Sequence, residues 1–166
     1  MKRFLVIMCL GIPGLVCGQN SSASGDESTK MDFWVGEWQL SWDGGKGVNR
    51  IEKTLDGQVI QENFEGIEGQ YAGFKGTSIS VFNPQSGSWH QAWADNNGGY
   101  INFIGEMDGD KRIFKTLPRQ GPNGTTIISR MRFYDIEEDS FTWDWERSTD
   151  GGETWTLNWR ISYTRL

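Results

Sequence analysis

The sequence predicts an all-β protein built as a single antiparallel meander β-barrel of about 8–10 strands. Two patterns support this: short segments alternate apolar with polar residues, and Gly-, Asn- and Asp-rich turn signals separate them at roughly 8–14 residue intervals. At 166 residues the chain fits one domain. Because short turns with no helical crossover join the strands, we expect hairpins in a sheet that closes on itself. A β-sandwich is the alternative, and periodicity alone does not separate the two.

The individual strands follow from this alternation. The first, residues 37–43, places Trp and Leu at every second position. Asp56-Gly57 is a strong hairpin turn signal between two others. The predicted strands are residues 37–43, 48–55, 58–65, 71–82, 88–95, 100–107, 112–117, 125–136, 141–147 and 154–163. A short N-terminal helical turn is expected around residues 28–35, with Ser28 as its candidate cap.

The N-terminus has the layout of a secretory signal peptide. A basic start, Met1–Arg3, precedes the apolar run Phe4–Val16 and then small residues. We expect residues 1–18 to be a signal peptide cleaved near Gly18, residues 19–30 a flexible polar tether, and residues 31–166 the barrel domain. The protein would then be exported, to the periplasm or the extracellular space. Lipid anchoring at Cys17 is not expected, because bulky Val16 stands where a bacterial lipobox has a small residue.

Composition argues against several classes of partner. The chain has 16 Lys and Arg against 22 Asp and Glu, a net charge of −6, which disfavours nucleic acid and anionic membrane surfaces. One His and two Cys argue against a His/Cys zinc cluster. No apolar run is long enough to span a bilayer comfortably. We therefore expect no nucleic-acid partner, no membrane span, no metal and no cofactor, in a monomer or homodimer.

Several segments together resemble a known family. They are residues 32–38 (DFWVGEW), 55–57 (LDG), 83–89 (NPQSGSW) and 148–159 (STDGGETWTLNW). Their order and spacing are similar to the bacterial DUF1579 family of lipocalin-like proteins, in the calycin superfamily. The resemblance implies a calycin barrel in which Trp38 stacks on Arg160 or Arg165 at the barrel floor. The family has no agreed activity, so the resemblance concerns the fold more than the function.

Two sharper motifs have plainer interpretations. Residues 148–155 fit the Asp-box of sialidase-type propellers, but a propeller needs several copies and this chain has one, so a turn is expected. His90 is the only imidazole, and it could serve as an axial haem ligand or as a catalytic base. A packed or hydrogen-bonded histidine is the default, because no nucleophile motif accompanies it.

The aromatic content is the most unusual feature, with nine Trp and nine Phe. Aromatic residues recur on one face of several predicted strands, as at Trp143 and Trp145 or at Trp155, Leu157 and Trp159. Such stripes form a core, and in a barrel the core face is also the wall of any cavity. The candidate ligand-binding residues are Glu62, Phe64, Trp93, Arg132, Trp143 and Asn158.

Parity does not decide which face of residues 130–134 points inward, so Arg132 is a candidate rather than a derived position. If it faces inward, it could hold a ligand carboxylate. Glu62 shares a strand face with Ile60 and Phe64, which makes it an inward candidate.

These observations favour an exported lipocalin-like barrel that binds a small, partly apolar molecule in an aromatic-lined cavity without chemistry. One alternative is a secreted barrel enzyme, a hydrolase or isomerase, that uses a pocket carboxylate or His90. A second is a carbohydrate-binding or protein-interaction module with a filled barrel. The carbohydrate binder predicts Trp rings lying flat on the outer surface.

Overall fold

The structure is a computed structural model that describes residues 26–166, apart from the side chain of Asp108. The expected signal peptide and most of the expected tether lie outside the described residues, so cleavage near Gly18 and the fate of Cys17 stay predictions. Residues 26–30, the end of that tether, contact the barrel. The Trp89 indole donates to the Glu27 carbonyl at 2.9 Å, and the Arg112 guanidinium donates to the Lys30 carbonyl at 2.9 Å.

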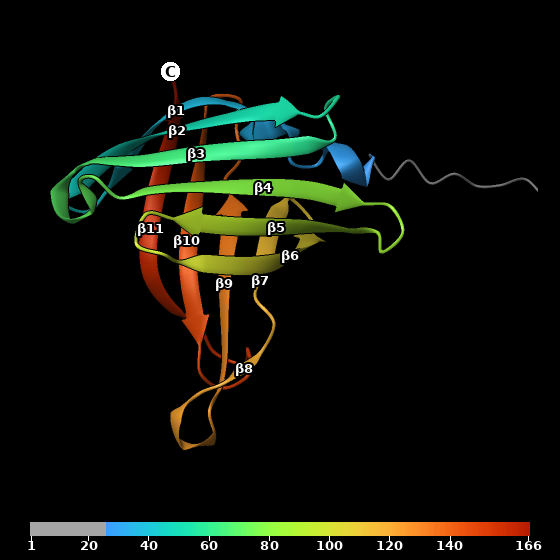
Figure 1. Ribbon diagram of the computed structural model, residues 1–166, viewed down its shortest axis with the longest axis vertical. Coiled ribbons are helices and arrows are strands. Elements are labelled where there is room, and N and C mark those ends of the chain that lie inside the picture. The colour runs from blue at the N-terminus through green and yellow to red at the C-terminus, as the bar shows by residue number, and fades with distance from the viewer. Residues whose placement is uncertain (1–25) are drawn as a thin grey trace, which may run out of the picture.

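Ten strands form one closed antiparallel barrel (Figure 1). β1 to β7 pair in chain order, β7 pairs with β9, and the pairs β9–β10, β10–β11 and β11–β1 close the ring. The strands are β1 (Gly36–Trp42), β2 (Gly45–Thr54), β3 (Val59–Glu68), β4 (Lys75–Asn83), β5 (Ser88–Asp95), β6 (Tyr100–Asp108), β7 (Lys111–Lys115), β9 (Thr126–Tyr134), β10 (Ser140–Ser148) and β11 (Thr156–Arg165). The meander barrel predicted from the sequence is confirmed, and the closing pairs exclude the sandwich.

Smaller elements complete the chain. β8 (Arg119–Gln120) forms a short ribbon on the beginning of β9, and it was not predicted. Four single-turn 3₁₀ helices are η1 (Glu27–Thr29), η2 (Asp32–Trp34), η3 (Gly69–Tyr71) and η4 (Pro122–Gly124). η1 and η2 confirm the expected N-terminal helical turn. Its cap is Asp26 rather than Ser28, because the Asp26 carboxylate accepts from the Ser28 backbone N–H at 3.0 Å.

Trp38 and Arg165 close one end of the barrel. The Trp38 side chain is fully buried, and its indole donates to the Trp34 carbonyl at 2.8 Å. The Arg165 guanidinium lies 4.1 Å over the Trp38 ring and donates to the Val35 carbonyl at 3.1 Å. A planar cation on an aromatic face fixes η2 across this end. Of the two arginines implied by the calycin resemblance, Arg165 makes the contact.

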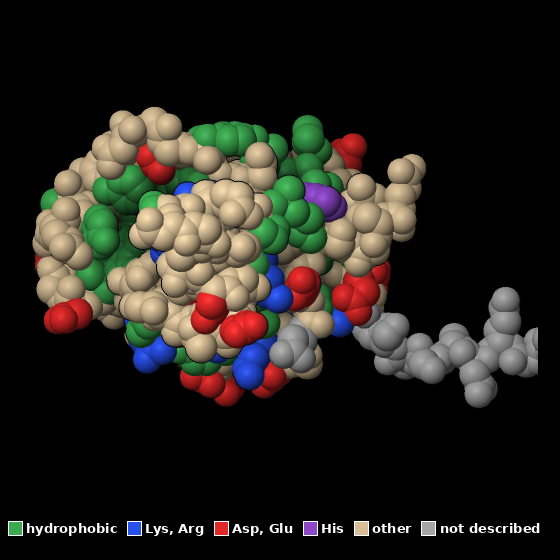
Figure 2. Space-filling view, turned by 90° about the horizontal axis from the view of Figure 1, so that it is seen from below, with side chains coloured by type: hydrophobic (Ala, Val, Ile, Leu, Met, Phe, Trp, Pro, Cys, Tyr) green, Lys and Arg blue, Asp and Glu red, His purple; other side chains and the backbone are tan. Residues whose placement is uncertain are grey.

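The other end of the barrel carries the turns of residues 43–44, 69–74, 96–99 and 149–155, because alternate turns of a meander lie at the same end. Seen from below in Figure 2, the molecule is hollowed between its loops, and hydrophobic side chains line the hollow. The turn at 149–155 is held by Asp150, whose carboxylate accepts from the Thr154 N–H at 3.0 Å. The Asp-box sequence is therefore a turn, as predicted.

Strand alternation separates the inner from the outer face. On β10, Phe141, Trp143 and Trp145 belong to the interior aromatic cluster, while Asp144 and Glu146 lie on the other face. On β9, Met131 and Phe133 are buried in the same interior cluster. The core is thus a set of aromatic and aliphatic side chains pointing into the barrel, and it surrounds the cavity described next.

Candidate functional site

A cavity of about 210 Å³ lies inside the barrel. Fifteen residues line it, contributed by η2, by the loop before β4 and by strands β3, β5, β6, β9, β10 and β11. Nine of the fifteen are aromatic: Trp34, Phe64, Phe74, Trp93, Phe103, Trp143, Trp145, Trp159 and Tyr163. The wall is therefore mostly apolar, with few polar groups, which is the usual composition of a small-molecule site.

Glu62 supplies a buried carboxyl to this wall. Its side chain points inward from β3 and is only 6% exposed. The Asn49 amide donates to Glu62 Oε1 at 2.7 Å, and the Ser78 hydroxyl donates to Oε2 at 2.6 Å. Asn49 lies on β2 and Ser78 on β4, the two strands that flank β3. Local register thus places two hydrogen-bond donors beside a buried carboxyl.

The polar network extends to both sides of Glu62. The Asn49 amide also donates to the Tyr163 hydroxyl at 3.3 Å, which connects β2 to β11. On the other side, the Gln91 amide donates to Ser78 Oγ at 3.2 Å and to Ser80 Oγ at 2.9 Å. All of these side chains are buried. A connected polar network inside an aromatic barrel fixes the position of Glu62.

No cation compensates this carboxyl. The lining drawn from the described residues includes no Lys, Arg or His. Burial raises the pKa of Glu62 above 4.5, although hydrogen bonds from Ser78 and Asn49 oppose the rise. Burial, followed by the nearby Glu62 charge, also raises the pKa of Tyr163. A carboxyl with a raised pKa in a cavity is a candidate for ligand binding or for proton transfer.

Asp95 is the second acidic group of the lining, at the end of β5. Its carboxylate accepts from the Trp93 indole at 3.1 Å and from the Gly99 N–H at 2.9 Å. Partial burial works to raise the pKa of Asp95, but hydrogen bonds from Gly99, Trp93 and Asn97 hold it below its usual value. Asp95 therefore stays ionised while it shapes the turn of residues 96–99, at the end of the barrel opposite Trp38 and Arg165.

Four of the six predicted site residues come together. Glu62, Phe64, Trp93 and Trp143 all line the cavity.

Arg132 and Asn158 do not line the cavity. Met131 and Phe133 face inward on β9, so Arg132 between them faces outward. Asn158 is exposed at a β-bulge on β11, where Trp145 pairs with Trp159 but Glu146 pairs with Leu157. The extra residue breaks the alternation, so the expected shared face of Trp155, Leu157 and Trp159 is wrong: Leu157 is 45% exposed, and Trp155 lies under Arg130.

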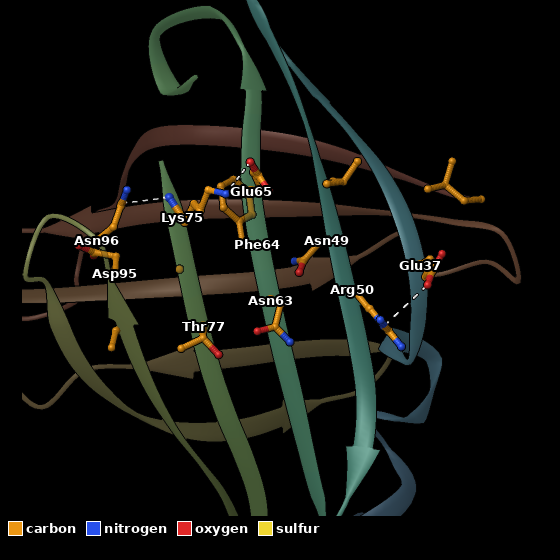
Figure 3. Close-up of a pocket in the computed structure, with 14 residues that line it drawn as sticks. Glu37, Asn49, Arg50, Asn63, Phe64, Glu65, Lys75, Thr77, Asp95 and Asn96 are labelled. Atoms are coloured by element: carbon orange, nitrogen blue, oxygen red, sulfur yellow. Dashed lines mark hydrogen bonds and ion pairs between the residues drawn. The ribbon is translucent and has the colours of Figure 1, made fainter. Parts of the chain in front are cut away.

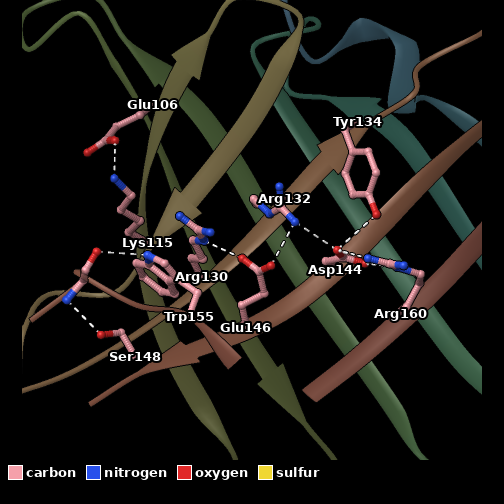
Figure 4. Close-up of polar contacts among 11 residues, drawn as sticks. Glu106, Lys115, Arg130, Arg132, Tyr134, Asp144, Glu146, Ser148, Trp155 and Arg160 are labelled. Carbon is pink, nitrogen blue, oxygen red and sulfur yellow. Dashed lines mark hydrogen bonds and ion pairs between the residues drawn. The ribbon is translucent and has the colours of Figure 1, made fainter. Parts of the chain in front are cut away.

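On the outer face, Arg132 belongs to a charged cluster with Asp144, Glu146, Arg130 and Arg160 (Figure 4). It donates to Asp144 at 3.1 Å and to Glu146 at 2.9 Å. Arg160 donates two hydrogen bonds to the Asp144 carboxylate, of 2.7 and 2.8 Å. Burial works to raise the pKa of Asp144, but hydrogen bonds from Arg160 and Tyr134 and the charges of Arg160 and Arg132 hold it lower. This cluster consists of groups already paired with one another.

A larger groove of about 720 Å³ lies on the outer face of β1 to β5 (Figure 3). Its charged side chains also pair among themselves, with Lys75 Nζ 2.8 Å from Glu65 Oε1 and Arg50 Nε 3.7 Å from Glu37 Oε1. It has more volume than the interior cavity, but its walls are mixed and its charges satisfied. The interior cavity is therefore the stronger candidate site.

His90 lies on the outer face of β5, where Nε2 is 3.2 Å from Ser88 Oγ and 3.4 Å from Ser86 Oγ. It does not line the cavity, which removes it from any chemistry there. All nine Trp lie within the described residues, and each is at least partly buried. None of the nine belongs to the fully exposed side chains of residues 26–166, so Trp exposure does not favour the carbohydrate binder.

Sequence reasoning missed Asn49, Ser78, Gln91 and Tyr163 as parts of this site. The signal was present: Asn49, Ser78, Ser80 and Gln91 are polar residues at strand positions whose parity is inward. A polar side chain on a buried strand face needs partners, and these residues are partners for one another.

Comparisons with known proteins add no assignment: no family model matches the chain, and the search of curated proteins found no match. The family resemblance therefore stays a prediction. Within residues 26–166, the helices are single 3₁₀ turns, none of them long and apolar enough to cross a membrane. The same residues contain no group of three His, Cys, Asp or Glu side chains that could hold a metal ion.

Proposed function

We propose that this chain is an exported calycin-like barrel, related to the DUF1579 proteins, that binds a small, partly apolar molecule. The observation that carries the proposal is the interior cavity, with nine aromatic residues and one buried, uncompensated carboxyl in its wall. Ligand burial against these rings contributes about 25 cal/mol per Å² of apolar surface. Export is supported by the sequence pattern of residues 1–18, and the active form is a monomer or homodimer.

The cavity volume limits the size of the ligand. At about 210 Å³ the space is smaller than the roughly 300–1,000 Å³ of most drug-sized sites. It equals the liquid volume of about seven water molecules, which corresponds to a ligand of similar size to one aromatic ring with a short substituent. Glu62 would orient such a molecule, and the rings would supply most of the binding free energy.

The test uses three probes of one shape: benzyl alcohol, benzylamine and benzoate. Binding is followed by tryptophan fluorescence, since five Trp line the cavity. We expect at least one probe to bind saturably. Ile101→Trp, which adds volume at the cavity wall, should abolish that binding, while Ile104→Trp, on the outer face of the same strand β6, should preserve it.

Circular dichroism and urea unfolding show that both variants remain folded. If no probe binds saturably to the wild-type protein, the proposed function is wrong. It is also wrong if a folded Ile101→Trp variant binds as tightly as wild type, because the probe then occupies another place.

A second function is favoured by one observation, the raised pKa of Glu62 inside the cavity. A carboxyl of this kind suits proton transfer to or from a bound substrate. This enzyme hypothesis predicts that Glu62→Gln abolishes turnover but retains ligand binding. The structure offers Glu62 no second catalytic group with a similarly raised carboxyl pKa, so binding without chemistry is the preferred function.

A further inference from the structure

We infer that the cavity selects an organic ammonium ion, held between the aromatic walls and the Glu62 carboxylate. This inference rests on the proposed function, because it names the chemical class of the ligand of the same cavity. It is carried by three features: the charge of the lining, the arrangement of the rings, and the unused acceptor capacity of Glu62.

The charge of the lining has one sign. Glu62 and Asp95 are its two ionisable carboxyls, and no basic side chain from the described residues accompanies them. An anionic ligand would face one or two negative charges with no compensating cation. A neutral ligand would contact the walls but gain little from the carboxyls. A cation removes the unfavourable isolation of Glu62, so binding relieves an energetic cost already present in the fold.

The aromatic walls favour the same sign of charge. Trp143 and Trp159 meet nearly at right angles, with ring centroids 5.8 Å apart and an interplanar angle of 89°. Phe64 meets Trp159 at 80°, with centroids 5.9 Å apart. These edge-to-face contacts orient neighbouring rings of the wall in different directions, and the electron-rich face of a ring exposed to the cavity attracts a cation.

Glu62 keeps acceptor capacity for a ligand. An ionised carboxylate offers about four acceptor positions. Asn49 and Ser78 each use one of them. The same two contacts hold the carboxylate still, so a bound ammonium group would meet a preorganised partner.

The titration of Glu62 couples to this binding. Side chains packed around Glu62 come from β2 (Asn49), β4 (Ser78) and β11 (Tyr163). Among the described residues that line the cavity, only Tyr163 and Asp95 also titrate, Tyr163 with a raised pKa and Asp95 with a lowered pKa. A bound cation favours the charged form of Glu62, so its binding releases a proton. Affinity for a cation should therefore rise with pH through the raised pKa, while affinity for a neutral isostere stays constant.

The experiment compares ligands that differ only in charge. Choline and 3,3-dimethylbutan-1-ol have the same shape, as do benzylamine and benzyl alcohol. Isothermal titration calorimetry of the wild-type protein at pH 7 should show about tenfold tighter binding of the cation in at least one pair. Glu62→Gln, which keeps the size of the side chain and removes the charge, should abolish that preference. Glu65→Gln, on the outer face of the same strand, should retain it.

The possible results are distinguishable. A cation preference above threefold that disappears in Glu62→Gln supports the ammonium ligand. A preference below threefold in both pairs overturns it but leaves the proposed function standing, provided that the neutral probes bind. If neither member of either pair binds, the ammonium ligand is overturned, and the proposed function fails with it only if benzoate does not bind either. A preference that persists in a folded Glu62→Gln variant overturns the assignment to Glu62. If that variant does not fold, the wild-type pH dependence decides: a cation affinity that stays as constant with pH as that of the neutral isostere overturns the assignment.

Discussion

Glu62 and Asp144 are both buried carboxyls on strands of the same barrel, yet their surroundings are opposite. Asp144 is fully buried on the outer side and is bound by Arg160, Arg132 and Tyr134. Glu62 is 6% exposed on the inner side, and its partners are neutral. As a consequence the pKa of Asp144 is lowered and the pKa of Glu62 is raised.

This contrast suggests different roles for the outer carboxyls and for Glu62. The outer carboxyls compensate arginines and tie β9, β10 and β11 together, which is a stabilising role. The inner carboxyl accepts hydrogen bonds from Asn49 and Ser78 but pairs with no cation among the described residues, and it lies against a cavity. Burying an acid without a cation costs free energy. A ligand that contacts Glu62 would explain why a carboxyl lies at this position.

The largest expected effect comes from breaking the outer cluster. Asp144→Ala leaves Arg132 and Arg160 facing each other without their shared carboxylate, and should lower the free energy of unfolding by about 3 kcal/mol. Urea denaturation measures this change. Asp139→Ala is the matched control, because that exposed carboxylate lies 3.4 Å from Arg165, and its loss should cost less than about 1 kcal/mol. Equal losses in the two variants would show that the outer cluster has no special role.

The raised pKa of Glu62 should make the free energy of unfolding depend on pH. A carboxyl whose pKa is raised in the folded state stabilises the fold fully below pH 4.5, and that stabilisation is lost as pH rises through the raised pKa. The free energy of unfolding of the wild-type protein should therefore fall relative to Glu62→Gln between pH 4 and 8, by about 1.4 kcal/mol per unit of pKa difference. Urea titrations at several pH values measure the two curves, with Glu65→Gln as the control that keeps the wild-type slope. Parallel curves for wild type and Glu62→Gln would mean that Glu62 titrates normally.

The smallest effect is expected at the exposed edge of the outer cluster. The Arg160 side chain is 53% exposed, so its ion pair with Asp144 is screened by water. When Arg160 is removed, water can take over part of its hydrogen bonding to Asp144. Arg160→Gln should lower the free energy of unfolding by about 1 kcal/mol or less, measured by urea denaturation. If Arg160→Gln lowered the free energy of unfolding as much as Asp144→Ala does, Arg132 and Tyr134 would not be sufficient to stabilise the Asp144 carboxylate.

The fold was predictable because strand periodicity and turn chemistry are local properties. Residues 88–95 were predicted as a strand and form one with the same bounds, since Trp89 and Trp93 alternate with outward residues between two clear turns. β8 escaped prediction because two residues carry no periodicity. The cap Asp26 was also missed, since Ser28 is an equally good capping residue by type.

The candidate site was predictable only in part, because its geometry depends on register between strands far apart in the chain. Glu62, Phe64, Trp93 and Trp143 follow from parity within single strands. Arg132 could not be oriented, since both faces of β9 carry large side chains. On β11, a bulge that the sequence does not announce turns Leu157 outward, away from the face that it was expected to share with Trp159. The hydrogen bonds from Asn49 and Ser78 to Glu62 require the pairing of β2, β3 and β4, which only the folded chain reveals.

The protonation of Glu62 is followed most directly by an NMR titration of its side-chain carboxyl carbon, in the free protein and in the presence of saturating benzylamine. We expect a pKa above 4.5 in the free protein, because the carboxyl is buried without a cation, and a lower pKa in the complex. A pKa at or below 4.5 in the free protein would contradict the central claim that Glu62 is uncompensated. A raised pKa that benzylamine leaves unchanged would contradict the claim that the cavity brings a cation to Glu62.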